Sequence, residues 1–227
     1  MAPDYLPAMQ DVHALVSEEI DRLGGKLHYS LDDGKRLFMQ SLLPRVQDVQ
    51  PRDSMQAGVG VMAADEEIVV QPYTFRRVCS NGLMLPYALE TQRIARVDPA
   101  APFEAVTEIT NALQAALRGC THPAVLSTAV GQMRLAIGRR GNLALHLLPM
   151  LSPVLRQTGV RVLERIQQRF RRERDDSLFG LINAVTSVAR DEPAPEARWQ
   201  LEELGGALLA VVPAPTPDAL AGETVLV

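Results

Sequence analysis

Two kinds of hydrophobic pattern follow one another along the chain, and their order constrains the fold more than any other feature. Between residues 26 and 97, short runs alternate apolar with polar residues, which is typical of β-strands with one buried face. From residue 98 to residue 211, apolar residues recur every three or four positions, as in amphipathic helices. A sheet followed by helices predicts an α+β fold.

Turn residues divide the first half into antiparallel pairs. Residues 27–31 and 36–43 flank an Asp-Asp-Gly-Lys turn and predict a hairpin. The strongest turn signal is Ser80-Asn81-Gly82, because a type I′ turn needs positive φ at both central residues and Asn-Gly tolerates it best. We therefore expect the run 68–79 to return antiparallel over 83–97.

The patterns predict one domain with four segments. Hydrophobic residues make up 47% of the 227, enough for a genuine core. In chain order we expect an N-terminal helix at 1–25, an antiparallel sheet at 26–97, a helical region packed on the sheet at 98–211, and a disordered tail at 212–227.

Several classes of protein are not expected. The first ten residues lack a secretory signal, and no apolar run reaches the length of a membrane span. Only two cysteines occur, Cys79 and Cys120, so no disulfide framework is expected and a cytoplasmic location is the simplest interpretation.

Signatures of catalysis are missing from the sequence. It contains no nucleophile elbow, phosphate loop, dinucleotide fingerprint or His-Glu-x-x-His motif. Cys120-Thr-His122 and Cys79 lack the second close-spaced pair of a zinc site, and Asp65-Glu66-Glu67 is best interpreted as a hairpin loop. We expect a non-catalytic protein without a metal, a cofactor or a small-molecule substrate.

Arginines are concentrated in one part of the chain. Residues 118–174 contain eleven arginines and only two acids, although the whole chain has a net charge of −4. Such an asymmetry is a sign of a polyanion-binding surface. In the predicted helix near 160–174, one face carries Val162, Leu163, Ile166 and Phe170, and the other carries Arg161, Arg165, Arg169 and Arg172.

This arginine face has three interpretations. The four guanidinium groups repel one another, and few glutamates stand where they would neutralise them. Phosphates of a nucleic acid could supply the counter-charge, or acidic groups of the same protein or a neighbouring subunit could, the N-terminal half being the obvious source. The face could also simply be solvated.

Two further basic elements are candidates for phosphate contacts. Arg139 and Arg140 stand between two glycines in a predicted loop, which is either a phosphate-binding turn or a plain polar turn. In the predicted strand 73–79, Tyr73, Phe75, Arg77 and Cys79 share one face, and Arg76 lies on the other. Tyr73 and Phe75 could stack bases while Arg76 and Arg77 hold phosphates, or the strand could be half-buried with one wet face.

One segment carries a resemblance. Gln71-Pro-Tyr-Thr-Phe-Arg-Arg-Val-Cys-Ser-Asn-Gly-Leu-Met84 resembles the Arg-x-Val-Cys-x-Asn-Gly strand and turn of a family of phage- and plasmid-related proteins of unknown function. Gly58-Val-Gly-Val-Met62 and Leu178-Phe-Gly-Leu-Ile-Asn-Ala-Val-Thr186 look like that family's preceding strand and C-terminal helix. The order of sheet and helices is also similar to that of single-strand annealing recombinases, an analogy of architecture alone.

Together these features predict a non-catalytic DNA-binding protein of recombination, repair or mobile-element biology. Single-stranded DNA is the favoured partner, and a homo-oligomer is expected. The alternative is a self-assembling interaction module, or a phage- or plasmid-encoded regulator, whose arginine face seats on an acidic protein surface.

Overall fold

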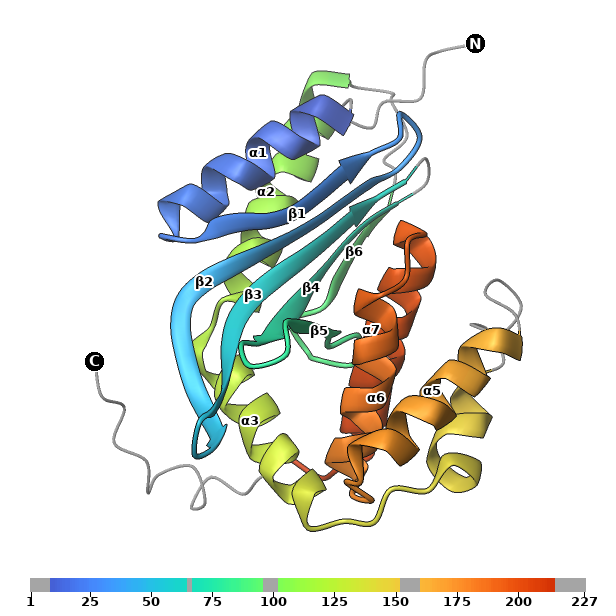
Figure 1. Ribbon diagram of the computed structural model, residues 1–227. Coiled ribbons are helices and arrows are strands. Elements are labelled where there is room, and N and C mark those ends of the chain that lie inside the picture. The colour runs from blue at the N-terminus through green and yellow to red at the C-terminus, as the bar shows by residue number, and fades with distance from the viewer. Residues whose placement is uncertain (1–8, 65–66, 96–101, 152–159, 215–227) are drawn as a thin grey trace. The chain divides into compact units, whose positions relative to one another are not determined.

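The structure confirms the α+β fold. It is a computed structural model that describes residues 9–64, 67–95, 102–151 and 160–214. An antiparallel sheet occupies the N-terminal half and helices follow it (Figure 1). Most of the predicted tail lies outside the described residues, as do Asp65 and Glu66 of the acidic cluster.

Six strands form one sheet. They are β1 (Lys26–Asp32), β2 (Leu37–Gln50), β3 (Asp53–Ala63), β4 (Glu67–Arg76), β5 (Asn81–Met84) and β6 (Gln92–Ala95). The order is β1-β2-β3-β4-β5, and β6 pairs antiparallel with β4. The predicted first hairpin is confirmed, since the β1–β2 register runs from Lys26 opposite Leu42 to Asp32 opposite Leu37.

The predicted type I′ turn at Asn81-Gly82 is wrong. The turn occupies residues 77–80, the positive φ of 55° falls on Ser80, and Asn81 and Gly82 begin β5. The side-chain amide of buried Asn81 donates to the carbonyl of Asn183, 3.4 Å away. Asn81 thus has partners on a distant helix, Asn183 and Arg190, which the local turn preference of Asn-Gly does not take into account. The predicted return strand is also interrupted, by turns between β5 and β6.

The helices follow the predicted periodicity. They are α1 (Met9–Arg22), α2 (Pro102–Cys120), α3 (Pro123–Ile137), a π-helical turn (Leu143–Leu147), a 3-10 turn (Leu148–Met150), α5 (Val160–Glu173), α6 (Leu178–Arg190) and α7 (Pro195–Ala210). Among the described helices, none has the length and apolar composition that crossing a membrane requires.

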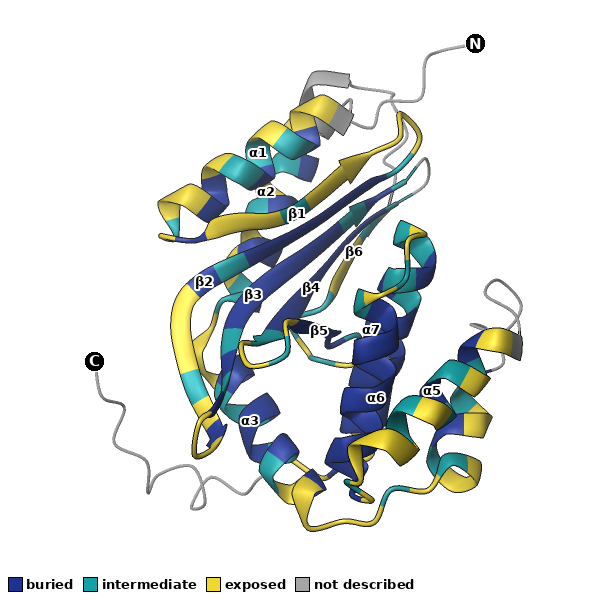
Figure 2. Cartoon of the chain, viewed as in Figure 1, coloured by how far each residue is buried: buried dark blue, intermediate teal, exposed yellow. Residues whose placement is uncertain are grey.

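The contacts group the chain into two compact units. Unit 1 combines Met1–Arg45, Gln56–Thr74 and Ala88–His122, and in it α1 packs on β1 and α2. Unit 2 combines Val46–Met55, Phe75–Tyr87 and Pro123–Val227. Helix α6 is the centre of unit 2: it packs against α5, α7 and β5, and its residues are buried from Leu178 to Ala189 (Figure 2).

Candidate nucleic-acid interface

Helix α5 has the two faces that its sequence predicts. Val162 and Ile166 are buried, and Leu163 and Phe170 are half-buried on the same side. Arg161 and Arg172 are exposed, whereas Arg165 and Arg169 are partly covered. The apolar face packs on α6, which fixes the arginines at the surface of unit 2.

Two of the four arginines on this face have carboxylate partners, as in the interpretation that acidic groups of the same protein supply counter-charge. Arg165 contacts the Glu192 carboxylate at 2.8 Å, and Arg169 contacts the Asp191 carboxylate at 2.9 Å. Because α5 packs on α6, the end of α6 lies beside the middle of α5. The counter-charges therefore come from residues directly after α6 and not from the N-terminal half.

A groove between α5 and the end of α6 is lined by three of these arginines. It has a volume of about 210 Å³, and we call it the arginine groove; its lining residues are Arg165, Gln168, Arg169, Arg172, Val188 and Asp191. The lining thus contains three guanidinium groups, one carboxamide and one carboxylate, and Glu192 pairs with Arg165 from outside the lining. Within the described part of the chain, Arg161 and Arg172 form no ion pair. Guanidinium groups in this number suit an anion with several acceptor oxygens.

The loop with Arg139 and Arg140 lies next to α5. One of its two glycines has a packing role: a Cβ on Gly141 would be 2.5 Å from the carbonyl oxygen of Ser177 and 3.1 Å from the Phe170 ring. The backbone N–H of Gly141 donates to the carbonyl of Asp176 at 2.7 Å. Arg139 and Arg140 are exposed, and the 4.0 Å contact of Arg140 with Asp176 is worth little because both side chains are nearly 90% exposed.

The structure contradicts two of the four candidates on β4 and the turn after it. Tyr73 is only 1% exposed, so it cannot stack on a base. Arg76 donates from Nε to Oδ1 of Asp53 at 2.7 Å and from Nη2 to Oδ2 at 2.6 Å, so its guanidinium is already occupied. Phe75 is half-buried and Arg77 is exposed, but Arg77 lies in the turn because β4 ends at Arg76.

Arg76 belongs to a structural cluster in unit 2. Its guanidinium lies 4.9 Å from the centre of the Phe179 ring on α6. Burial alone would lower the pKa of Arg76, but hydrogen bonding to Asp53 and electrostatic attraction to Cys79 and Asp53 outweigh burial and raise that pKa. Arg190 donates to the carbonyl of Cys79 and so ties the end of α6 to the turn after β4. Residues 71–84 and 178–186, two of the three segments that show a resemblance, therefore contact each other, and their polar residues hold β4, β5 and α6 together.

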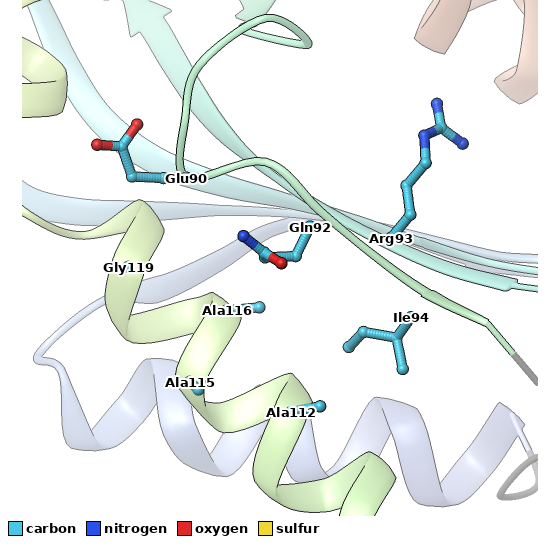
Figure 3. Close-up of a pocket in the computed structure, with 8 residues that line it drawn as sticks. All are labelled: Glu90, Gln92, Arg93, Ile94, Ala112, Ala115, Ala116 and Gly119. Atoms are coloured by element: carbon cyan, nitrogen blue, oxygen red, sulfur yellow. The ribbon is translucent and has the colours of Figure 1, made fainter. Parts of the chain in front are cut away.

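Unit 1 contains a larger but chemically plainer cavity. It has a volume of about 460 Å³ between β6 and α2, with Glu90, Gln92, Arg93 and Ile94 on one side and Ala112, Ala115, Ala116 and Gly119 on the other (Figure 3). Arg93 extends away from α2 and contacts Glu67 at 2.7 Å. Its α2 side is lined by alanines and a glycine, and its titratable lining residues, Glu90 and Arg93, do not converge. The lining residues therefore offer neither a nucleophile nor an acid–base pair.

The two cysteines differ in burial, and this difference predicts unequal reactivity. Burial first, then the charge of Glu90, raises the pKa of Cys120 to about 12, and its thiol donates to the Glu90 carbonyl at 3.4 Å. Because the thiolate is the reactive form, we expect a thiol reagent at neutral pH to label half-buried Cys79 first and Cys120 only on unfolding. Equal rates for Cys79→Ser and Cys120→Ser variants would contradict this.

The same shift predicts a pH dependence. An unfolded cysteine ionises near pH 8.5, whereas folded Cys120 keeps its proton up to about 12, so the free energy of unfolding should fall as the pH rises through this window.

Among the described residues, no three His, Cys, Asp or Glu side chains gather as metal ligands.

The sequence contains signals for the two carboxylates that pair with the arginines of α5, and these were missed. Asp191 and Glu192 stand directly after the helix that follows α5. Two consecutive helices joined by a short turn pack antiparallel, which places the end of the second beside the earlier turns of the first. Gln168 lies one turn before Arg172 on the exposed face of α5 and was missed because it carries no charge.

No protein-family model, curated protein or solved structure matches the chain. The resemblance to phage- and plasmid-related proteins therefore stays a prediction from the sequence. A function for this protein has to be inferred from the geometry and charge of the arginine groove.

Proposed function

We propose that this protein is a non-catalytic nucleic-acid-binding protein that holds phosphates on the arginine groove and on the exposed arginines beside it. The observation that carries the proposal is the composition of the groove: Arg165, Arg169 and Arg172 line it, Glu192 pairs with Arg165 and Asp191 with Arg169, and the guanidinium of Arg172 is left in excess. An excess of guanidinium groups at a surface is stabilised by an external polyanion. Arg161, Arg139 and Arg140 are exposed on the same unit and extend the basic surface.

Contacts of this kind are made to the backbone and carry no base information. We therefore expect affinity to depend steeply on salt and weakly on sequence. The preference for single strands has less support than the sequence indicated, since the burial of Tyr73 leaves half-buried Phe75 as the remaining one of the two predicted stacking candidates. Single-strand preference, self-association and a role in recombination, repair or mobile elements stay predictions.

The test is the double variant Arg161→Gln, Arg172→Gln. Neither side chain forms an ion pair with a described residue, so removing both charges should leave the fold intact. We expect affinity for labelled oligonucleotides to fall about tenfold and the slope of log K against log salt to fall by about 2, one for each lost phosphate contact. Fluorescence anisotropy with single- and double-stranded oligonucleotides at several salt concentrations measures both quantities.

The matched control is Arg36→Gln, Arg93→Gln, which makes the same change in charge at two partly exposed arginines of unit 1. This variant should bind like the wild type. Absent binding at low salt, or an affinity that salt does not change, would exclude the proposed function. Light scattering in the same buffers tests the alternative, because salt-labile oligomers without nucleic-acid affinity would favour self-assembly.

A further inference from the structure

Asp191 occupies the arginine groove as an anion of the protein itself. Its Oδ2 lies 2.9 Å from Arg169 and its Oδ1 lies 3.1 Å from Arg190, so each carboxylate oxygen contacts a different guanidinium. The side chain is 42% exposed and lines the groove together with Arg165, Arg169 and Arg172. The carboxylate therefore stands among the same donors that a bound phosphate would use.

The position of Asp191 is unfavourable for a carboxylate in the absence of the arginines. Asp191 is the C-terminal cap of α6, and the last carbonyl groups of a helix create a partial negative charge there. Asp191 and Glu192 add two more negative charges at this end. Stabilisation of α6 does not explain these residues, whereas neutralisation of the arginines on α5 does.

The carboxylates of Asp191 and Glu192 differ in how easily each can break its ion pair with an arginine of α5. Glu192 is 14% exposed and contacts Arg165, which also donates to the carbonyl of Val188 at 3.4 Å. The two arginines are similarly exposed, at 39% for Arg165 and 30% for Arg169, but the Asp191 side chain is 42% exposed, so water reaches its carboxylate more easily than that of Glu192. Glu192 thus holds α5 to α6, and the contact between Asp191 and Arg169 is the exchangeable one.

We infer that the arginine groove is a site for one phosphate group and that Asp191 holds that place in the unbound protein. The inference rests on the proposed function and adds the regulation of the same site. A water molecule takes about 30 Å³ of liquid volume, so the groove of about 210 Å³ has room for a tetrahedral oxyanion beside the side chains. Arg169, Arg172 and Gln168 can donate to its oxygens once the Asp191 side chain turns to water. The carboxylate lowers the affinity for phosphate by competition and by repulsion.

The test compares Asp191→Asn with Asp176→Asn. Both variants remove one negative charge from unit 2, but Asp176 is 88% exposed and lies outside the groove. We expect Asp191→Asn to tighten oligonucleotide binding about threefold to fivefold, the effect of one exposed ion pair, and Asp176→Asn to change it less than twofold. Adding Arg169→Gln to Asp191→Asn should abolish the gain, because Asp191 acts on that guanidinium.

Inorganic phosphate as a competitor distinguishes the source of the phosphate group. It should displace the oligonucleotide from Asp191→Asn at a lower concentration than from the wild type if the groove accepts any phosphate; a gain confined to the oligonucleotide would assign the site to a backbone phosphodiester. Equal gains for Asp191→Asn and Asp176→Asn would overturn the inference and leave the proposed function standing. Absence of binding by the wild type and by Asp191→Asn at low salt would overturn both.

Discussion

Replacing Gly206 with alanine should lower the free energy of unfolding by about 3 kcal/mol, the upper end of ordinary overpacking. Gly206 lies in α7 where this helix crosses β5, and a Cβ there would be 1.8 Å from the carbonyl oxygen of Met84. The obstacle is backbone, which cannot rotate away as a side chain would. A Cβ on Gly205 beside it would lie 2.7 Å from the side chains of both Leu83 and Thr186, so the whole contact depends on the two missing side chains.

Helix propensity predicts the opposite sign for this substitution. In an exposed helix, alanine is more favourable than glycine by about 1 kcal/mol. Gly119→Ala in α2 is the matched control, since nothing lies within 4 Å of a Cβ at that position, and we expect it to be neutral or stabilising. Urea unfolding followed by circular dichroism gives both values. A Gly206→Ala protein as stable as the wild type would mean that α7 does not approach β5 this closely.

Local sequence patterns were sufficient for the elements of this fold. Alternating and helical periodicities depend on neighbours along the chain, and they predicted the first hairpin and the helices after residue 102. The turn at Asn81-Gly82 failed because its outcome depends on Asn183 and Arg190, about a hundred residues away. The contact of Gly205 and Gly206 with β5 could not be predicted for the same reason, because nothing near these glycines in the sequence shows what they pack against.

The candidate site was predicted in part for a similar reason. The periodicity of residues 160–174 separated Arg161, Arg165, Arg169 and Arg172 from the apolar face, and the structure places them on the same side of α5. The arginine-rich stretch spans residues 118–174, but four acidic residues follow it: Asp175, Asp176, Asp191 and Glu192. Packing of α5 on α6 brings the last two onto the arginines, and a count along the sequence cannot show that.

Breaking the ion pair between Asp53 and Arg76 should also destabilise unit 2 by about 3 kcal/mol. The Asp53 side chain is 6% exposed and that of Arg76 is 19% exposed, and two hydrogen bonds join them. Arg76→Met would leave the Asp53 carboxylate with Gln50, at 3.3 Å, as its remaining side-chain donor among the described residues. Asp53→Leu would leave a guanidinium without its counter-charge against the Phe179 ring. The estimate is at the low end for buried pairs because Arg76 still reaches water.

The double variant Asp53→Leu, Arg76→Met separates the ion pair from the packing around it. Replacing both charges with apolar groups removes the cost of burying them, so the double variant should recover most of the stability that either single variant loses. Arg77→Met, at the exposed neighbour, should stay within about 0.5 kcal/mol of the wild type. Urea unfolding midpoints and slopes of all four variants complete the cycle; a double variant no more stable than the singles would show that the pair itself is not the source of the loss.

Nucleic-acid affinity gives the second readout. If Arg76 is structural, the refolded double variant binds oligonucleotides as the wild type does; weaker binding at full stability would return Arg76 to the interface from which its contact with Asp53 removes it.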